Sequence, residues 1–267
     1  MSDKKIIYLK KNNELYKVKK IKETKKNNIV VFDLDETLGH FVQLSIFWDA
    51  LKKYHNKNLS DEHFFFTLNL FDQFLRPRIL KILKYLKYKK LENNCDKVMI
   101  YTNNQGPKEW ANLIKSYFHY KLKYPLFDQV IGAFKVHGKL IESNRTSHDK
   151  SVKDLLNCTK LPEDTQICFL DDQYHHNMIN DNVVYINVKP YVYTIPFEEM
   201  ANIYYHAYYN HHNNMKNKPS KQNFINFILN YIKDYNFPIL SKTNIEYQVD
   251  DILSKKIFIY LKEFFDN

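Results

Sequence analysis

The sequence predicts an α/β fold in which a parallel β-sheet carries helices on both faces. Short, continuous apolar runs indicate strands that are buried on both sides. Apolar residues at helical spacing lie between those runs, and strands that alternate with helices are typical of a parallel sheet. The first three runs each end in polar residues, and such sheets bind their ligands at the carboxyl ends of the strands. The chain has 267 residues, 44% of them hydrophobic, which suffices for one large domain with an appendage.

The N-terminal segment, residues 1–28, is predicted to be a small basic β-hairpin. Two strand-like stretches, residues 6–9 and 15–21, flank the turn-like residues 10–13. The strands of the sheet follow as four apolar runs at residues 29–32, 98–101, 167–170 and 183–186. We expect a sheet of five strands or slightly more, with the first run at its centre between the second and the third.

Three helices are predicted between these strands. The first has Ile79, Ile82, Leu83 and Leu86 on one face. The second begins near Pro107 and repeats this spacing. The third is short: Ser151 caps its N-terminus, with Asp154 three residues later, and it ends near Cys158.

The last part of the chain, residues 195–267, predicts a helical extension. Apolar stripes at helical spacing fall within residues 200–208, 224–231 and 257–264, and prolines separate them. Helices packed on the main domain are the favoured interpretation, and a partner-binding extension is the alternative.

Composition excludes several classes of protein. No run of eighteen apolar residues exists, so we expect no membrane-spanning helix, and residues 1–5 lack the apolar stretch of a secretory signal. Three widely spaced cysteines (Cys95, Cys158 and Cys168) argue for a reducing, intracellular compartment, either cytoplasm or nucleus. The net charge of +10 comes from scattered lysines, which favours solvated faces over a nucleic-acid groove. Abundant Lys, Asn, Tyr, Ile and Phe with few Gly indicate an AT-rich genome, such as that of a large DNA virus or a protist.

The stretch that carries the predicted chemistry follows the first strand. Asp33 and Asp35 lie two positions apart, so a bend after the strand would turn both carboxylates into one pocket. Two buried like charges are costly unless a cation compensates them. Mg²⁺ binds carboxylate and carbonyl oxygens and is the expected cofactor.

The segment Asp33-Leu-Asp-Glu-Thr-Leu38 resembles the first motif of the haloacid dehalogenase (HAD) superfamily, in the form typical of the NLI-interacting-factor-like phosphatases. Further segments resemble that family in the expected order: Leu75-Arg-Pro77, Tyr101-Thr-Asn-Asn104, Ser151-Val-Lys-Asp-Leu155 and Cys168-Phe-Leu-Asp-Asp172. The resemblance covers about residues 29–190 and implies a HAD-like Rossmannoid domain over residues 29–194.

The resemblance implies a role for each of these residues. Asp33 would attack phosphorus to form an aspartyl-phosphate, and Asp35 would act as general acid and base. Thr37 would orient Asp35 and is a further candidate for phosphate binding, and Thr102 with Asn103 and the following backbone amides would bind phosphate. Mg²⁺ would bind Asp33, the Asp35 carbonyl and Asp172. Asp171 is a further candidate metal ligand and would hold a lysine.

Two lysines are candidates for the one that Asp171 would hold. Alignment on the Val-Lys-Asp-Leu segment selects Lys153. The expected helix cap at Ser151 instead places Lys150 just before the helix, where a pocket-facing lysine usually lies, so Lys150 is favoured. His175, His176, His211 and His212 lack the spacing of metal ligands and are expected on the surface. Cys168 is expected in the core.

The predicted function is hydrolysis of a phosphomonoester, with phosphoserine or phosphothreonine in a protein as the favoured substrate. The insert at about residues 39–74 is too short for a large cap, so we expect it to lean over the site and leave the pocket open to a macromolecule. A polynucleotide phosphatase, a small-metabolite phosphatase and a non-enzymatic HAD-like interaction protein are the alternatives.

Overall fold

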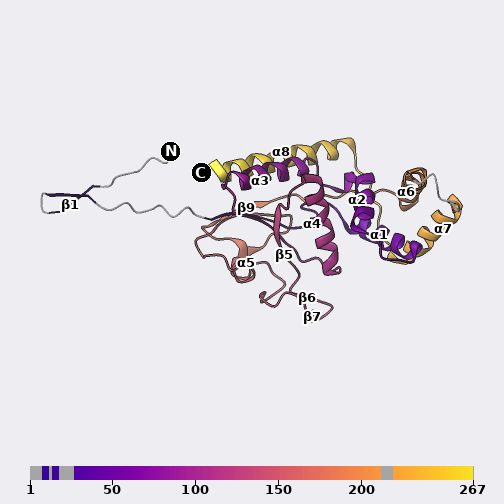
Figure 1. Cartoon of the computed structure of the whole chain (residues 1–267), viewed down its shortest axis with the longest axis horizontal. Helices are drawn as coiled ribbons and strands as arrows, with labels where there is room; N and C mark the ends of the chain where they lie inside the picture. The colour runs from indigo at the N-terminus through magenta and orange to yellow at the C-terminus, as the bar shows by residue number, and fades with distance from the viewer. Residues whose placement is uncertain (1–7, 12–13, 18–26, 212–218, 267) are drawn as a thin grey trace.

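A computed structural model describes residues 8–11, 14–17, 27–211 and 219–266. Its centre is a five-stranded sheet in the order β5-β4-β3-β8-β9, and every neighbouring pair is parallel. The strands are β3 (Asn28–Phe32), β4 (Lys97–Tyr101), β5 (Phe127–Ile131), β8 (Gln166–Asp171) and β9 (Val183–Asn187). The chain therefore has an α/β architecture compatible with a Rossmann-like fold (Figure 1).

The four apolar runs all form strands, and β3 lies at the centre between β4 and β8, as predicted. The fifth strand, β5, was not predicted because Asp128 and Gln129 interrupt its apolar residues. The Asp128 carboxylate accepts hydrogen bonds from the Val98 amide at 2.8 Å and from the Lys90 ammonium. A polar residue within this strand thus pairs with the neighbouring strand and helix.

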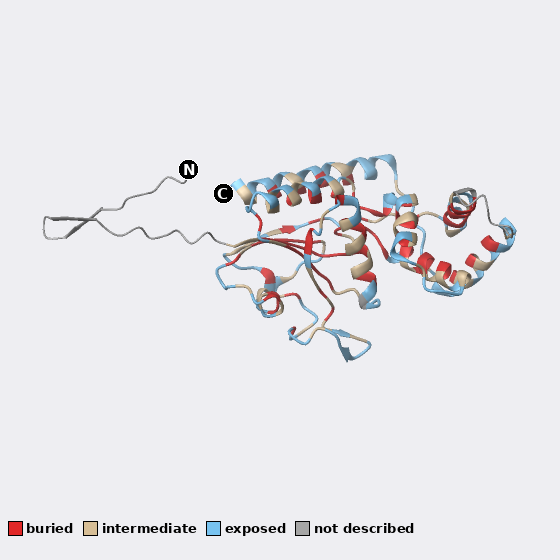
Figure 2. Cartoon of the chain, in the orientation of Figure 1, coloured by how far each residue is buried: buried red, intermediate tan, exposed pale blue. Residues whose placement is uncertain are grey.

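Alternate residues of the central strands pack into two separate hydrophobic cores. Val30 and Phe32 contribute to the larger core, which includes helices α3 (Ile79–Leu91) and α4 (Lys108–Leu122). Val31 and Phe169 contribute to the smaller core with α5 (Val152–Thr159). Figure 2 shows the buried residues along the central strands and on the inner sides of these helices. Helices therefore cover both faces of the sheet, as expected from strands without polar alternation.

The predicted helix boundaries agree with the structure at their starts. α3 begins at Ile79, and Pro107 immediately precedes α4. The Ser151 side chain caps α5 by accepting a hydrogen bond from the Asp154 amide at 3.1 Å. This cap fixes the point at which the chain leaves the loop that contains Lys150.

The insert is helical and packs with part of the C-terminal extension. It forms α1 (Val42–His55), α2 (Asp61–Leu70) and the short 3₁₀ helix η1 (Asp72–Phe74). α1 contacts α7 (Lys221–Ile232), and α2 contacts both α4 and α6 (Phe197–His211). α1, α2, α6 and α7 gather at one end of the sheet, as Figure 1 shows.

The final helix, α8 (Asn244–Asp266), runs beside α3 in Figure 1. The Arg78 guanidinium binds the Asp251 carboxylate through two hydrogen bonds, and the Tyr85 and Phe258 rings meet edge to face at 5.2 Å. The short 3₁₀ helices η2 (His176–Met178) and η3 (Lys233–Tyr235) complete the helical elements among the described residues. All three C-terminal helices thus pack on the rest of the chain, which was the favoured interpretation.

Four short strands lie outside the main sheet. β1 (Tyr8–Lys11) and β2 (Glu14–Lys17) pair antiparallel within the predicted N-terminal hairpin, whose remaining residues lie outside the described ones. β6 (Lys135–Val136) and β7 (Lys139–Leu140) form a second hairpin after β5. Within the described ranges, no helix combines the length and apolar character that crossing a bilayer requires.

Candidate active site

Asp33 and Asp35 lie in a tight loop at the carboxyl end of β3, which we call the acidic loop (residues 33–39). Glu36 has a positive φ of 56°, and this left-handed residue turns the chain back so that the Leu38 amide bonds to the Leu34 carbonyl at 3.0 Å. The sharp bend expected after the strand is present.

The buried Arg76 side chain anchors the acidic loop through hydrogen bonds to its backbone carbonyls. Arg76 Nε donates to the Thr37 carbonyl at 2.6 Å, and Nη2 donates to the carbonyls of Glu36 at 2.5 Å and Lys189 at 2.9 Å. Charge-assisted hydrogen bonds of this kind are stronger than neutral ones. Arg76 therefore fixes the backbone on which both aspartates depend.

The centre of the site is a buried lysine between two carboxylates. Lys150 is only 1% exposed. Its Nζ donates to Asp33 Oδ1 and to Asp171 Oδ2, the latter at 2.6 Å. Asp171 ends β8 beside β3, so the parallel register brings the two acids to the same edge of the sheet.

The structure separates the two candidate lysines. Lys153 lies within α5 and is exposed, so its candidacy for the pocket is wrong. The Ser151 cap explains the difference, because Lys150 precedes the helix and can turn toward the sheet while Lys153 lies on the outer surface of the helix.

Asp171 also contacts a histidine that was expected on the surface. His175 Nε2 lies 3.4 Å from Asp171 Oδ2, and the His175 side chain is only 11% exposed. Burial opposes ionisation of Asp171, but contacts with His175 and Lys150 hold its pKa below the usual value. The surface assignment of His175 is therefore wrong, whereas His176 is exposed as predicted.

Thr37, in the acidic loop, orients Asp172 through two hydrogen bonds. Thr37 Oγ1 donates to Asp172 Oδ1 at 3.0 Å and lies 3.1 Å from the Asp172 amide, which donates to it. Among the described residues, the Thr37 hydroxyl therefore orients Asp172 and not the expected Asp35, while its expected contact with phosphate stays a prediction. The second Asp172 oxygen, Oδ2, accepts a hydrogen bond from Gln173.

Asp35 accepts a hydrogen bond from Asn104, which lies in the loop that follows the neighbouring strand β4. Asn104 Nδ2 donates to Asp35 Oδ2 at 2.5 Å, while Asp35 Oδ1 is buried and has no hydrogen-bond partner among the described residues. Burial raises the pKa of Asp35 to about 6, although the hydrogen bond from Asn104 lowers it. A carboxyl group with this pKa can give and take a proton near neutral pH.

Thr102 and Asn103 begin the loop that follows β4, which we call the Thr102 loop (residues 102–107). Thr102 is 3% exposed and its Oγ1 accepts a hydrogen bond from the Asn104 amide at 3.0 Å. Asn103 Oδ1 accepts a hydrogen bond from Arg145 at 2.8 Å. Asn103 therefore supports the loop, and the prediction that it contacts the phosphate is not supported by this geometry.

Sequence reasoning missed Arg145. Its Nη1 donates to the carbonyls of Thr102 at 3.2 Å and Gly132 at 2.7 Å, and its Nη2 also donates to the His148 carbonyl at 2.9 Å. The residue is 2% exposed and lies in a loop without apolar periodicity, so the sequence carried no signal for it. Arg145 therefore connects the Thr102 loop, through hydrogen bonds, to the segment at His148 that leads to Lys150.

The donor set fits a divalent cation. Carboxylate oxygens of Asp33, Asp171 and Asp172 all lie within 4.8 Å of one another. With all three carboxylates ionised, they and the Lys150 ammonium would carry a net charge of −2, which one Mg²⁺ would balance. Burial raises the pKa of Asp33 to about 8 despite the contact with Lys150, so a further positive charge beside it would favour its ionised form.

Two cavities flank the Thr102 loop. The larger, of about 580 Å³, lies between α1, α2 and α4. The smaller, of about 310 Å³, lies between this loop and the β6–β7 hairpin and includes Thr102. Asn104, which binds Asp35, lines both. The insert thus forms a wall beside the site through α1 and α2.

Comparison of the chain with protein families, curated proteins and solved structures gave no match. The assignment of a function therefore depends on the site itself.

Proposed function

We propose that this chain is a Mg²⁺-dependent phosphomonoester hydrolase of the HAD type, with phosphoserine or phosphothreonine in a protein as its substrate. The observation that carries the proposal is the buried Lys150, which contacts Asp33 and Asp171 at the carboxyl ends of adjacent strands. A structural ion pair does not need a third carboxylate, but a phosphate site with a metal does, and Asp172 supplies it.

In this proposal, Asp33 is the nucleophile. One carboxylate oxygen attacks phosphorus, the bond from phosphorus to the ester oxygen breaks, and an aspartyl-phosphate forms on Asp33. Lys150 stabilises the negative charge that Asp33 and the phosphoryl group share. Mg²⁺, held by Asp33, Asp172 and the Asp35 carbonyl, would neutralise phosphate charge.

Asp35 moves the protons. Its carboxyl group gives a proton to the leaving ester oxygen, and in the second step it takes a proton from the water that attacks phosphorus, which frees phosphate and Asp33. The raised pKa of Asp35 supports this role, and Asn104 orients its carboxyl group. The Thr102 hydroxyl and the amides of the Thr102 loop would bind phosphate oxygens.

The first test is hydrolysis of p-nitrophenyl phosphate by the purified chain with Mg²⁺ or with EDTA. We expect turnover only with Mg²⁺, and its loss in Asp33→Asn, which keeps the shape of the side chain but removes the nucleophile. Equal turnover in the folded Asp33→Asn variant would contradict the assignment. Phosphopeptides, phosphorylated DNA ends and sugar phosphates then separate the substrate classes.

A further inference from the structure

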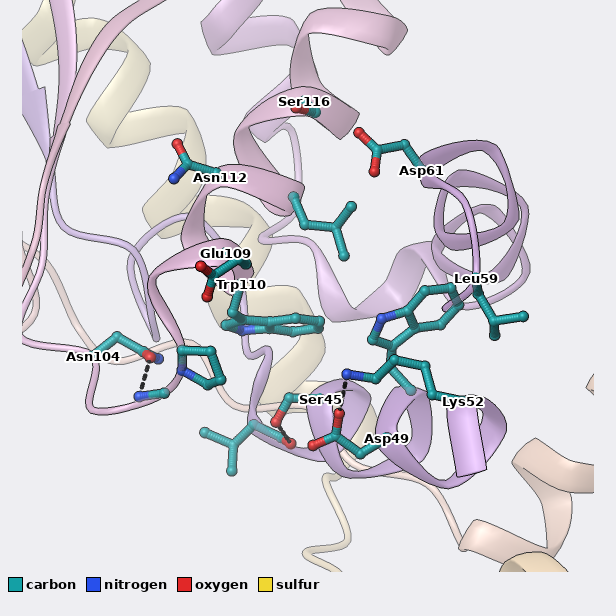
Figure 3. A pocket seen from close by; sticks show the side chains of 15 residues that line it. Ser45, Asp49, Lys52, Leu59, Asp61, Asn104, Glu109, Trp110, Asn112 and Ser116 are labelled. Carbon is teal, nitrogen blue, oxygen red and sulfur yellow. Dashed lines mark hydrogen bonds and ion pairs between the residues drawn. The ribbon is translucent and has the colours of Figure 1, made fainter. Parts of the chain in front are cut away.

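The larger cavity beside the site has aromatic and aliphatic walls. Trp48 comes from α1 and Trp110 from α4, and Leu59 and Leu113 also line the cavity. Trp110 and Leu59 are labelled in Figure 3. Its volume of about 580 Å³ falls in the range of sites that enclose small ligands, so it can take a long side chain together with part of a peptide backbone.

The aromatic walls are packed against one another in the structure. Phe64 lies between the two tryptophans, with ring centroids 5.3 Å from Trp48 and 5.4 Å from Trp110, and both contacts are edge to face. Trp48 is 4% exposed and Trp110 is 7% exposed. Binding would therefore require little reordering of these side chains.

The rim of the cavity is acidic in a chain whose net charge is +10. Asp49, Asp61 and Glu109 lie around the opening, and Lys52 is the one cationic side chain among the described residues that line it (Figure 3). Lys52 is paired with Asp49 at 2.6 Å. Neither Asp61 nor Glu109 has an ion pair among the described residues, and both are exposed, so the rim has two negative charges to offer.

The cavity connects to the reacting groups through Asn104. This residue lines the cavity, and its side chain donates to Asp35 Oδ2 and accepts a hydrogen bond from the Gly106 amide at 2.7 Å. The proposed general acid contacts the leaving oxygen of the substrate. A substrate bound at Asp35 therefore has its neighbouring residues close to this cavity.

We propose that the cavity binds an arginine side chain of the phosphorylated protein, near the phosphorylated residue in the substrate sequence. The aliphatic stem of an arginine packs on apolar walls, and its planar guanidinium group pairs with carboxylates, so an apolar cavity with an acidic rim fits arginine better than a neutral side chain. This inference rests on the proposed phosphatase function and adds a substrate class to it: phosphoserine or phosphothreonine in a basic sequence.

The test uses phosphoserine peptides in which one arginine is moved stepwise along an otherwise neutral sequence. At one or two positions we expect arginine to raise kcat/KM at least about fivefold over alanine, and glutamate at the same position to lower it. The double variant Asp61→Asn/Glu109→Gln should lose most of the arginine effect while its turnover of p-nitrophenyl phosphate is unchanged. Glu198→Gln/Glu199→Gln, which neutralises two exposed acids in the first turn of α6, is the matched control and should keep the effect.

A second readout does not depend on catalysis. Trp48 and Trp110 are the two tryptophans of the chain, so intrinsic tryptophan fluorescence reports directly on the cavity. We expect a saturable, salt-sensitive change on titration with an unphosphorylated arginine peptide, with weaker binding by Asp61→Asn/Glu109→Gln.

The two proposals fail in different ways. Turnover of p-nitrophenyl phosphate without any arginine preference would overturn the arginine site and leave the phosphatase intact. No turnover, with saturable peptide binding at the tryptophans, would overturn the phosphatase and leave a cation-binding cavity. An arginine effect that persists in Asp61→Asn/Glu109→Gln would place the basic subsite elsewhere and refute this assignment.

Discussion

Replacement of Lys150 by methionine tests the core of the site, because it keeps the aliphatic stem and removes the ammonium group. Lys150 is 1% exposed and donates to carboxylates of Asp33 and Asp171, so its loss leaves buried acids without their cation. Removal of one partner from a buried ion pair costs about 3–5 kcal/mol. Because burial already raises the pKa of Asp33, a proton can replace the lysine in part, and we expect the lower limit, about 3 kcal/mol.

The assay is thermal and urea unfolding of the metal-free protein. A loss of about 3 kcal/mol corresponds to a melting temperature lower by about 6–12 °C in a chain of this size. Lys153→Met is the matched control, since Lys153 is exposed three residues away, and it should change the free energy of unfolding by less than about 0.5 kcal/mol. A larger effect at Lys153, or an effect below about 1 kcal/mol at Lys150, would refute the assignment of Lys150 to the buried site.

Three further predictions concern the supports of the site. Gly39→Ala would place a Cβ atom 2.4 Å from the Phe74 carbonyl oxygen and should lower the free energy of unfolding, measured in urea, by about 3 kcal/mol. Gly132→Ala is the control: the nearest atom to its Cβ would lie at 3.8 Å, so the same free energy should change by less than about 1 kcal/mol. His119 Nε2 accepts a hydrogen bond from the Phe127 amide at 3.0 Å, and burial lowers the pKa of His119. The stability that His119 contributes is therefore complete above its unfolded pKa of about 6.5 and is lost as the pH falls below that value. The difference in unfolding free energy between wild type and His119→Gln should therefore shrink on acidification, and a constant difference would contradict this reasoning. Asp172→Asn should raise the Mg²⁺ concentration for half-maximal phosphatase activity at least about tenfold, while Asp181→Asn on the surface should leave it unchanged.

The sheet was largely predictable because four of its strands are continuous apolar runs. β5 was not predicted because Asp128 lies within it. The hydrogen bonds that this carboxylate accepts from the Val98 amide and from Lys90 form only when the strands are paired. The helix cap at Ser151 also carried real information, since it favoured Lys150 over Lys153 from local geometry alone.

The loop residues were harder to predict. Asn103 and Asn104 are chemically identical neighbours, and only the folded loop turns one toward Arg145 and the other toward Asp35. The resemblance implied that Thr37 orients Asp35, yet the partner of its hydroxyl, Asp172, is 135 residues away in the sequence. Side-chain direction in a loop depends on tertiary contacts, which hydrophobic periodicity does not report.

The central claim is that Asp33 carries a covalent phosphoryl group during turnover. The direct measurement is rapid acid quenching of the chain with p-nitrophenyl phosphate and Mg²⁺, followed by borohydride reduction of any acyl phosphate and mapping of the modified peptide by mass spectrometry. We expect modification at Asp33 that requires Mg²⁺ and is absent in Asp33→Asn. Modification of another side chain, or sustained turnover with Asp33 unmodified throughout, would contradict it.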